Sequence, residues 1–223
     1  MSVINIAIDG PAGAGKSTAA KAVALKLGIV YVDTGAMYRA LALKAVRLGT
    51  DPADEEKVLS FLPETQVDIA YENGSQHIFL DGEDVTAFIR TEKVSQASSV
   101  ISTLPCVRKK LTQLQRKIAR SRSVVMDGRD IGTVVLPGAD YKYFITAGPE
   151  ERAKRRYLEY KAAGKLAGRS FEDILKEINI RDHRDSHREA APLRAADDAF
   201  IIDTSDMGID ETVQAVLERI KEQ

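Results

Sequence analysis

One feature constrains the fold more than any other: an apolar run, a glycine-rich loop and a helical stretch follow one another within the first 28 residues. The three segments are VINIAI (3–8), DGPAGAGKST (9–18) and AAKAVALKLG (19–28). The loop fits the pattern G-x-x-x-x-G-K-[ST] at Gly10, Gly15, Lys16 and Ser17. In such a loop, backbone N–H groups and the N-terminus of the following helix point at anionic oxygens. The start of the chain therefore predicts a strand, a phosphate-binding loop and a helix, in that order.

The loop indicates that a nucleotide phosphate is bound, but it does not indicate which reaction that phosphate undergoes. Lys16 is expected to reach the β- and γ-phosphates of a nucleotide, and the Ser17 hydroxyl is expected to help hold Mg²⁺. The D-x-x-G and N-K-x-D motifs of Ras-type GTPases and the L-S-G-G-Q-like stretch of ABC-type ATPases are absent from the sequence. Three functional interpretations of the loop stay open: a small-molecule kinase, an uncommon ATPase and a nucleotide-dependent switch. The structural alternative is an ordinary glycine-rich turn.

The same alternation of strands and helices continues along the chain. Further short, apolar strand candidates are residues 29–32, 123–126, 141–146 and 199–203. Helices are expected over about 16–27, from Pro105 onward and from about Asp210. Because most of these strands are apolar on both faces, helices are expected to cover both faces of the sheet. The pattern predicts an α/β fold built on a parallel sheet.

Residues 65–86 break this alternation. Asn73-Gly74 and Asp81-Gly82 are residue pairs typical of tight hairpin turns. We therefore expect a small antiparallel meander inserted into the α/β core.

Composition narrows the class of protein. The chain has 223 residues, is 44% hydrophobic and 29% charged, and carries a net charge of −1, which favours a soluble globular protein and disfavours nucleic-acid binding as the main role. No apolar run of 18 residues predicts a membrane span, and no secretory signal is visible, so we expect a cytoplasmic protein. The single cysteine, Cys106, is expected to be an inert packing residue. His183 and His187 lack a third ligand, so no metal role is assigned to them.

The stretch DTGAMYR (33–39) follows the second strand candidate. Four residues are expected near the carboxyl edge of the sheet, where open parallel sheets bind ligands: Asp33, Thr34, Tyr38 and Arg39. The alternative is a helix N-cap followed by a solvated arginine.

The stretch VVMDGRDIGTVV (124–135) follows another strand candidate. Asp127 closes that strand, at the position where a nucleotide enzyme places a carboxylate near its Mg²⁺. Arg129 and Asp130 follow at the same edge, so the stretch suits a site that binds a phosphate and a base edge. The alternative is a structural turn with a local ion pair.

A charged helix is predicted after a capping box at Ser170 and Asp173. One face of this helix begins apolar and becomes ionic, in the order Ile174, Ile178, Arg181, Asp185 and Arg188. Arginine suits phosphate because its planar fork binds two oxygens at once, while the alternative is a solvated helix with an i,i+4 ion pair. Because residues 150–189 are strongly charged, including Arg152, Arg155 and Arg156, we expect a poor core there and a mobile cover over a phosphate site.

Four stretches together resemble the bacterial-type cytidylate kinases: IDGPAGAGKST, DTGAMYRA, DGRDIGTVV and RDHRDSHREAAPL. The resemblance runs in order along nearly the whole chain. It implies the fold of the nucleoside monophosphate kinases within the P-loop proteins, with a five-stranded parallel sheet flanked by helices, a small antiparallel insert and a helical lid. It also implies a single kinase domain, with its core at 1–62, 105–148 and 190–223, an insert at about 63–104 and a lid at about 149–189.

The resemblance also implies roles for individual residues. ATP would be bound by Gly10, Pro11, Ala12, Gly13, Ala14, Gly15, Lys16, Ser17, Thr18 and Arg155. CMP would be bound by Thr34, Tyr38, Arg39, Ser99, Arg108, Arg129, Asp130, Arg181, Asp185 and Arg188, with Ser98 as the alternative to Ser99. The catalytic residues would be Lys16, Asp127, Arg129, Arg181 and Arg188. Mg²⁺ would be held by Ser17 and, through water, by Asp127.

The implied reaction is transfer of the ATP γ-phosphate to CMP or dCMP in a monomeric enzyme. The acceptor is a phosphate dianion at neutral pH, so the reaction needs charge neutralisation rather than a general base. A kinase for another monophosphate is the nearest rival hypothesis. A nucleotide-sensing or RNA-binding protein is another; it would use the basic helix that holds Arg108, Lys109, Lys110, Arg116, Lys117, Arg120 and Arg122. A solvated helix face is the explanation we favour for that cluster.

Overall fold

Five short apolar strands pair into one sheet, in the order β2-β6-β1-β7-β8. The strands are β1 (Asn5–Asp9), β2 (Val30–Asp33), β6 (Val124–Asp127), β7 (Tyr141–Thr146) and β8 (Phe200–Asp203). The central strand β1 lies parallel to β6 on one side and to β7 on the other. Ile6, Ala7 and Ile8 are fully buried, as expected for a strand covered on both faces. The predicted five-stranded parallel sheet is confirmed.

The computed structural model describes residues 3–72 and 75–221, and the chain divides into two compact units. The first unit comprises Met1–Tyr31 and Arg122–Gln223, and the second comprises Val32–Ser121. The second unit therefore includes more of the chain than the insert expected at about 63–104. None of the helices described is long and apolar enough to cross a membrane.

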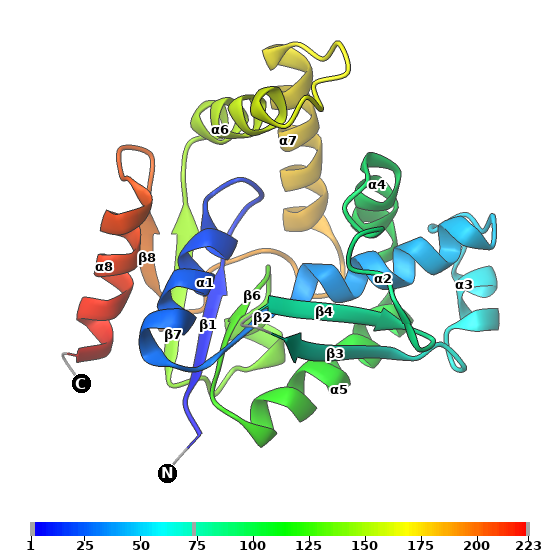
Figure 1. Ribbon diagram of the computed structural model, residues 1–223, viewed down its shortest axis with the longest axis horizontal. Coiled ribbons are helices and arrows are strands. Elements are labelled where there is room, and N and C mark those ends of the chain that lie inside the picture. Colours follow the sequence, from blue (N-terminus) through cyan, green and yellow to red (C-terminus); the bar gives the residue numbers. More distant parts are fainter. Residues whose placement is uncertain (1–2, 73–74, 222–223) are drawn as a thin grey trace. The chain divides into compact units, whose positions relative to one another are not determined.

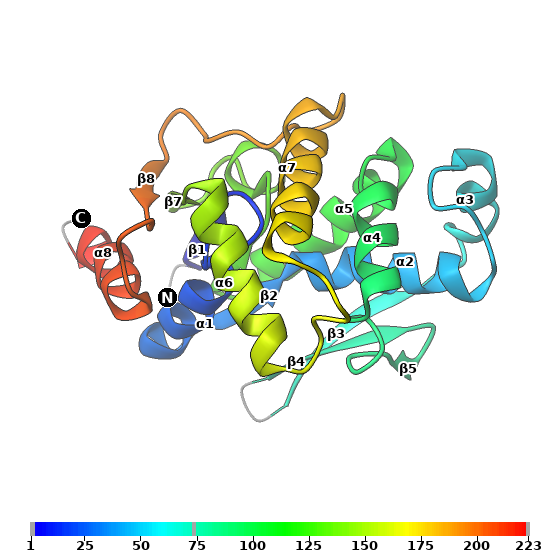
Figure 2. The ribbon, with the colours of Figure 1, turned by 90° about the horizontal axis from the view of Figure 1, so that it is seen from above.

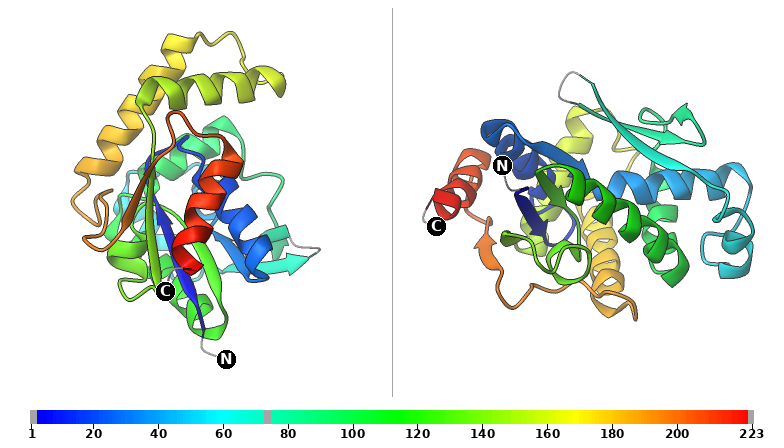
Figure 3. Two further views of the ribbon diagram at one scale, coloured as in Figure 1. Left: turned by 90° about the vertical axis from the view of Figure 1, so that its left-hand side faces the viewer. Right: turned by 90° about the horizontal axis from the view of Figure 1, so that it is seen from below.

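In the first unit, α1 (Lys16–Leu27) and α8 (Ile209–Lys221) lie side by side against the sheet (Figures 1 and 3). Ala20 and Val23 of α1 share a core with Val216 of α8. Helix α1 ends at Gly28, which adopts the left-handed conformation (φ 65°) that favours glycine at a helix C-terminus. Both helices lie where the sequence predicts them.

The predicted lid consists of α6 (Pro149–Ala162) and α7 (Phe171–His187), which pack on each other (Figure 3). The predicted capping box at Ser170 is present. The poor core expected for this segment is a small one, in which Ala153, Ile174 and Ile178 are buried together. Most charged residues of the two helices are not buried, but Arg152 and Asp185 are.

The second unit holds the inserted meander and four helices. The helices are α2 (Thr34–Arg47), α3 (Glu55–Phe61), α4 (Glu92–Ile101) and α5 (Pro105–Ser121). The strands β3 (Val67–Glu72), β4 (Ser75–Leu80) and β5 (Glu83–Asp84) form an antiparallel sheet (Figure 2). Asp81 and Gly82 both have positive φ and form the predicted turn between β4 and β5. The other predicted turn, Asn73-Gly74, lies outside the described residues.

Helix α5 is only partly the solvated basic face expected from its sequence. Lys109, Arg116, Lys117 and Arg120 are exposed. Arg108 is buried, and Lys110 donates a hydrogen bond from Nζ to the carbonyl of Leu62 at 2.9 Å. The apolar face of α5, which includes Val107 and Leu111, packs into the core of the unit, and Cys106 packs partly buried against the same core.

Candidate active site

The glycine-rich loop connects β1 to α1, and its backbone needs glycine at two positions. Gly10 has φ +144°, and a Cβ there would lie 1.9 Å from the carbonyl oxygen of Ile145. Gly13 has φ +79°, and a Cβ there would lie 3.2 Å from the Cβ of Arg152. The loop can therefore lie close to β7 and α6 only because these side chains are absent.

Lys16 begins α1 and is buried. Its Nζ donates a hydrogen bond to the carbonyl oxygen of Pro11 at 2.6 Å, across the loop. Burial lowers the pKa of Lys16 well below its usual value, and the nearby Arg129 lowers it further. A phosphate bound in the loop would favour the charged form of Lys16, because it would supply the counter-charge that this site needs.

The carboxylate of Asp127, at the end of β6, is buried beside the loop. It accepts a hydrogen bond from the Ser17 hydroxyl at 2.7 Å and another from the Tyr31 hydroxyl at 2.8 Å. A hydroxyl and a carboxylate are oxygen donors of the kind Mg²⁺ prefers. Among residues 3–72 and 75–221, no three His, Cys, Asp or Glu side chains could hold a metal ion by themselves. A cation at Ser17 and Asp127 would therefore need oxygens from a bound nucleotide.

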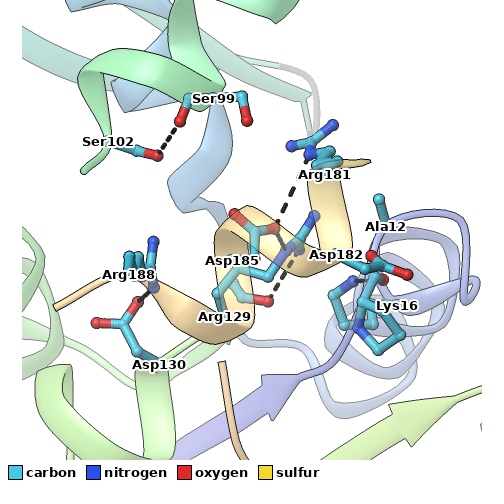
Figure 4. A network of polar contacts seen from close by, with 12 residues as sticks. Ala12, Lys16, Ser99, Ser102, Arg129, Asp130, Arg181, Asp182, Asp185 and Arg188 are labelled. Carbon is cyan, nitrogen blue, oxygen red and sulfur yellow. Dashed lines mark hydrogen bonds and ion pairs between the residues drawn. The ribbon is translucent and has the colours of Figure 1, made fainter. Parts of the chain in front are cut away.

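Asp185 joins two other predicted site residues, Arg129 and Arg181 (Figure 4). Its Oδ2 accepts a hydrogen bond from Arg129 Nε at 2.9 Å and lies 3.9 Å from Arg181 Nε. Burial alone would raise the pKa of Asp185, but Arg129 and Arg181 together lower it overall. The expected i,i+4 pair on α7 is present, and it lies at a buried carboxylate rather than on a solvated face.

Arg188 follows the last residue of α7, in extended backbone. Its Nη2 donates to Asp130 Oδ1 at 3.3 Å, and its Nε donates to the carbonyl of Ala191 at 2.7 Å (Figure 4). Arg188 and Asp130 are both buried. The stretch after β6 and the end of α7 are thus joined by two ion pairs, Arg129–Asp185 and Asp130–Arg188.

Arg152, on α6, is a site residue to which the sequence analysis gave no individual role. It is buried, and it donates from Nε to the carbonyl of Ala147 at 2.8 Å and from Nη1 to the carbonyl of Ala12 at 3.1 Å. Nη1 also lies 2.6 Å from Asp182 Oδ2, on α7. Arg152 therefore links the loop to both helices of the predicted lid. Nothing in its local sequence separates it from the exposed basic residues beside it.

Arg155 lies one turn further along α6, next to the loop. Its Nη1 donates to the Thr204 hydroxyl oxygen at 3.1 Å. The Thr204 hydroxyl in turn lies 3.3 Å from the carbonyl oxygen of Ala14 in the loop. Of the predicted site residues outside the loop, Asp127 bonds to Ser17 and Arg155 is linked to the loop through Thr204.

Asp9, immediately before the loop, is a second residue that sequence reasoning missed. Its carboxylate is buried and accepts hydrogen bonds from the backbone N–H groups of Ile131 and Gly132, at 2.8 and 2.7 Å. Burial raises its pKa to about 7. The available signal was an acidic residue at the end of an otherwise apolar strand.

In the second unit, Asp33 is the centre of a polar cluster. It caps α2 by accepting a hydrogen bond from Ala36 N at 2.9 Å, and its other oxygen accepts from Arg39 at 2.9 Å and from Arg90 at 3.0 Å. The N-cap of the alternative interpretation is present, but Arg39 is paired and mostly buried rather than solvated. The ligand-binding interpretation of DTGAMYR stays a prediction. Burial would raise the pKa of Asp33, but Arg39 and Arg90 lower it overall. Arg90 was not predicted from the sequence.

The remaining predicted residues of this unit lie on α2, α4 and α5. The Arg108 guanidinium lies over the ring of Tyr38, 5.7 Å from its centroid, and donates to the carbonyl of Ser102 at 3.1 Å. Ser98 and Ser99 are both buried on α4, and the Ser102 hydroxyl donates to the Ser99 carbonyl at 3.1 Å (Figure 4). Thr34 is buried in the first turn of α2.

Comparison with known proteins shows the family to which this chain belongs. Residues 6–222 match the family model described as cytidylate kinase. The chain belongs to the cytidylate kinase family. A cytidylate kinase of Caldicellulosiruptor bescii is 50% identical over 218 residues, covering 98% of this chain and 96% of that protein. The cytidylate kinase of Lactobacillus johnsonii is 44% identical over 219 residues, covering 98% and 94%.

A solved structure supports the fold independently of the cytidylate kinase sequences. Shikimate kinase from Bacteroides thetaiotaomicron superposes with a TM-score of 0.51 at 14% identity, over 99% of both chains. At that identity the likeness concerns the fold alone. The predicted P-loop kinase fold is confirmed.

Proposed function

We propose that this protein is an ATP-dependent kinase that converts CMP to CDP. The observation that carries the proposal is its membership of the cytidylate kinase family, with relatives of that name about 50% identical over 98% of the chain. The complete phosphate loop, from Gly10 to Thr18, supports ATP as the phosphate donor.

The reaction needs no general base. A phosphate oxygen of CMP attacks the γ-phosphorus of ATP, the bond from that phosphorus to the bridging oxygen breaks, and ADP leaves. Because the CMP phosphate is mostly a dianion at pH 7, it has no proton that must be removed first. The protein must instead bring two anions together, so cationic side chains are the groups that it needs.

Lys16, Arg129, Arg181 and Arg188 are the cations we assign to this task. Arg129 and Arg181 share the Asp185 carboxylate, and Arg188 is paired with Asp130. These pairs support the assignment, because they hold long side chains in defined positions before a substrate arrives. Asp127 would assist through Mg²⁺ rather than through proton transfer.

Mg²⁺ fits the oxygen donors of Ser17 and Asp127, which lie 2.7 Å apart. When bound with ATP, the cation neutralises charge on the β- and γ-phosphates. Asp127 would then orient the Ser17 hydroxyl or a metal-bound water.

For CMP, we propose that Arg39 and Arg129 hold the phosphate, and that Arg181, Asp185 and Arg188 contact the ribose and the transferring phosphates. Cytosine would be recognised by Ser99, Arg108 and Asp130, with Thr34 and Tyr38 nearby. The side chains of Arg39 and Arg108 are each held by neighbours inside the second unit, which supports a role in orienting a ligand. We assign Arg155 to ATP binding because it lies beside the phosphate loop.

We also propose that the enzyme accepts dCMP, acts as a monomer in the cytoplasm and needs no nucleic acid or membrane partner. The net charge of −1 supports the lack of a nucleic-acid partner, and the single cysteine fits a reducing compartment such as the cytoplasm.

An acceptor screen tests the proposed function directly. We expect rapid ATP-dependent turnover with CMP and dCMP, and much weaker turnover with UMP, AMP and GMP, measured by coupled detection of ADP. Strong activity with another monophosphate and little with CMP would contradict the proposal.

The same assay tests the role of Asp130. Asp130→Ala is expected to reduce the kcat/KM ratio of CMP over UMP by about tenfold or more, because each good polar contact to a base contributes about 1–3 kcal/mol of discrimination. The KM for ATP is expected to change by less than about threefold, since no role in ATP binding is assigned to Asp130. An unchanged base preference would remove Asp130 from the recognition site.

A further inference from the structure

Asp9 forms two hydrogen bonds that join the ends of two neighbouring strands. It is the last residue of β1, and one oxygen of its carboxylate accepts from Ile131 N at 2.8 Å while the other accepts from Gly132 N at 2.7 Å. The side chain is buried, so water does not compete for these two bonds. The carboxylate therefore fixes the backbone that begins at Ile131.

That backbone is a single turn of π-helix, Ile131–Val135, which is an uncommon conformation that recurs at functional sites. The turn begins directly after Arg129 and Asp130. The carbonyl of Asp130 accepts hydrogen bonds from Val134 N at 2.9 Å and from Val135 N at 3.1 Å, so the orientation of the Asp130 backbone depends on the turn.

Gly132 lies close to the side chains of Asp9 and Lys142. A Cβ at Gly132 would lie 3.5 Å from Asp9 Oδ2 and 3.3 Å from Cδ of Lys142. A carboxylate from β1 and a lysine stem from β7 thus both approach the turn closely. Because β1, β7 and the turn all meet at Gly132, the turn is held in one position rather than forming a loose loop.

We infer that Asp9 is a positioning residue for the acceptor substrate: its two bonds to Ile131 and Gly132 orient Arg129 and Asp130. This inference rests on the proposed function, in which those two residues contact CMP. Asp9 is assigned no contact with either substrate, and its two side-chain hydrogen bonds go to the turn after β6 rather than to the phosphate loop. Its loss should therefore affect CMP more than ATP.

The protonation state of Asp9 gives the inference a second signature. Burial raises the pKa of Asp9 to about 7, although the hydrogen bonds from the backbone N–H groups of Gly132 and Ile131 lower it. Of the two charged groups that face the carboxyl, Asp130 raises its pKa and Lys16 lowers it. A protonated carboxyl has one hydroxyl donor, so it cannot accept both N–H groups well. The two hydrogen bonds that hold the turn at Ile131 and Gly132 should therefore weaken as the pH falls from 8 to 6.

Asp9→Asn tests the inference, because asparagine has the same shape but presents an NH₂ group to one of the two N–H donors. We expect the KM for CMP to rise on the order of tenfold, with the KM for ATP within about twofold of wild type. Asp140→Asn is the matched control: Asp140 accepts from Asn5 N at 2.7 Å, at the opposite end of the same strand. It is expected to leave both KM values unchanged.

The pH profile separates positioning from simple loss of stability. In wild type, the KM for CMP should rise from pH 8 to pH 6 more steeply than in Asp9→Asn, where only the protonation of the CMP phosphate remains. Equal effects of Asp9→Asn on the KM values for CMP and for ATP would overturn the inference. CMP turnover by the wild-type enzyme tests the proposed function separately.

If Asp9→Asn does not fold, the wild-type protein still gives an answer. In a ¹⁵N-labelled sample, the amide signals of Ile131 and Gly132 should shift together with a midpoint near the raised pKa of Asp9. Amide protons of Ile131 and Gly132 that exchange with solvent as fast as N–H groups without a hydrogen bond would overturn the inference, because Asp9 would then not hold the turn.

Discussion

Lys16→Ala is expected to lower kcat by about three orders of magnitude. Removing one preorganised electrostatic contact to the reacting group typically costs 10²–10³ in kcat, and Lys16 is the cation of the loop that holds the transferred phosphate. Its ammonium is already buried and directed across the loop to Pro11, so little rearrangement separates it from a bound phosphate. Single-turnover assays with saturating ATP and CMP would measure the effect.

Lys26→Ala is the control for this prediction. Lys26 lies in the last turn of the same helix and is exposed, so its removal is expected to change kcat by less than about twofold. A Lys16→Ala enzyme that retained more than a tenth of wild-type kcat would contradict the role assigned to Lys16.

Gly10→Ala is expected to lower the free energy of unfolding by about 3 kcal/mol or more. The new methyl group would lie 1.9 Å from the carbonyl oxygen of Ile145, a backbone atom of the adjacent strand β7, and the residue also has φ +144°. Neither the central strand nor its neighbour can move away without breaking ladder hydrogen bonds. Urea unfolding followed by circular dichroism would measure the loss, and ATP binding should weaken as well.

Gly28→Ala separates the two causes of that loss. Gly28 also has positive φ, at +65°, but no atom lies within 4 Å of its added Cβ. Only the conformational cost of about 1 kcal/mol is expected there. Equal losses at Gly10 and Gly28 would show that the close approach to Ile145 is unimportant.

The strands, the phosphate loop and most helices could be predicted from the sequence because their signals are local. VINIAI is apolar on both faces, Gly28 ends a helix, and Ser170 begins another with a capping box. Each signal lies within a few residues of the element that it predicts.

The residues that sequence reasoning missed have partners far along the chain. Asp9 bonds to the turn at Ile131, Arg152 bonds to the loop at Ala12, and Arg90 bonds to Asp33. Before the fold is known, each looks like an ordinary charged residue. The pairing that makes a buried charge tolerable is a property of the tertiary structure.

The composition of α6 and α7 shows what a count of charges can predict. Both helices are rich in charged residues, but a few apolar residues at spaced positions still pack, and Ala153, Ile174 and Ile178 form such a contact. The spacing of Ile174 and Ile178 could be predicted from the sequence, whereas their partner Ala153 on α6 could not.

The order of the strands has a consequence for synthesis of the chain. Strand β1 and the phosphate loop precede residues 32–121 in the chain, but among the described residues β1 pairs with β6, at Val124–Asp127, and with β7, at Tyr141–Thr146. Until β6 and β7 have been synthesised, the buried central strand has no partner in the sheet, while the residues of the second unit have already left the ribosome. During that part of synthesis β1 is an unpaired apolar segment that is prone to aggregation, and the phosphate loop that follows it lacks the β7 backbone against which Gly10 packs.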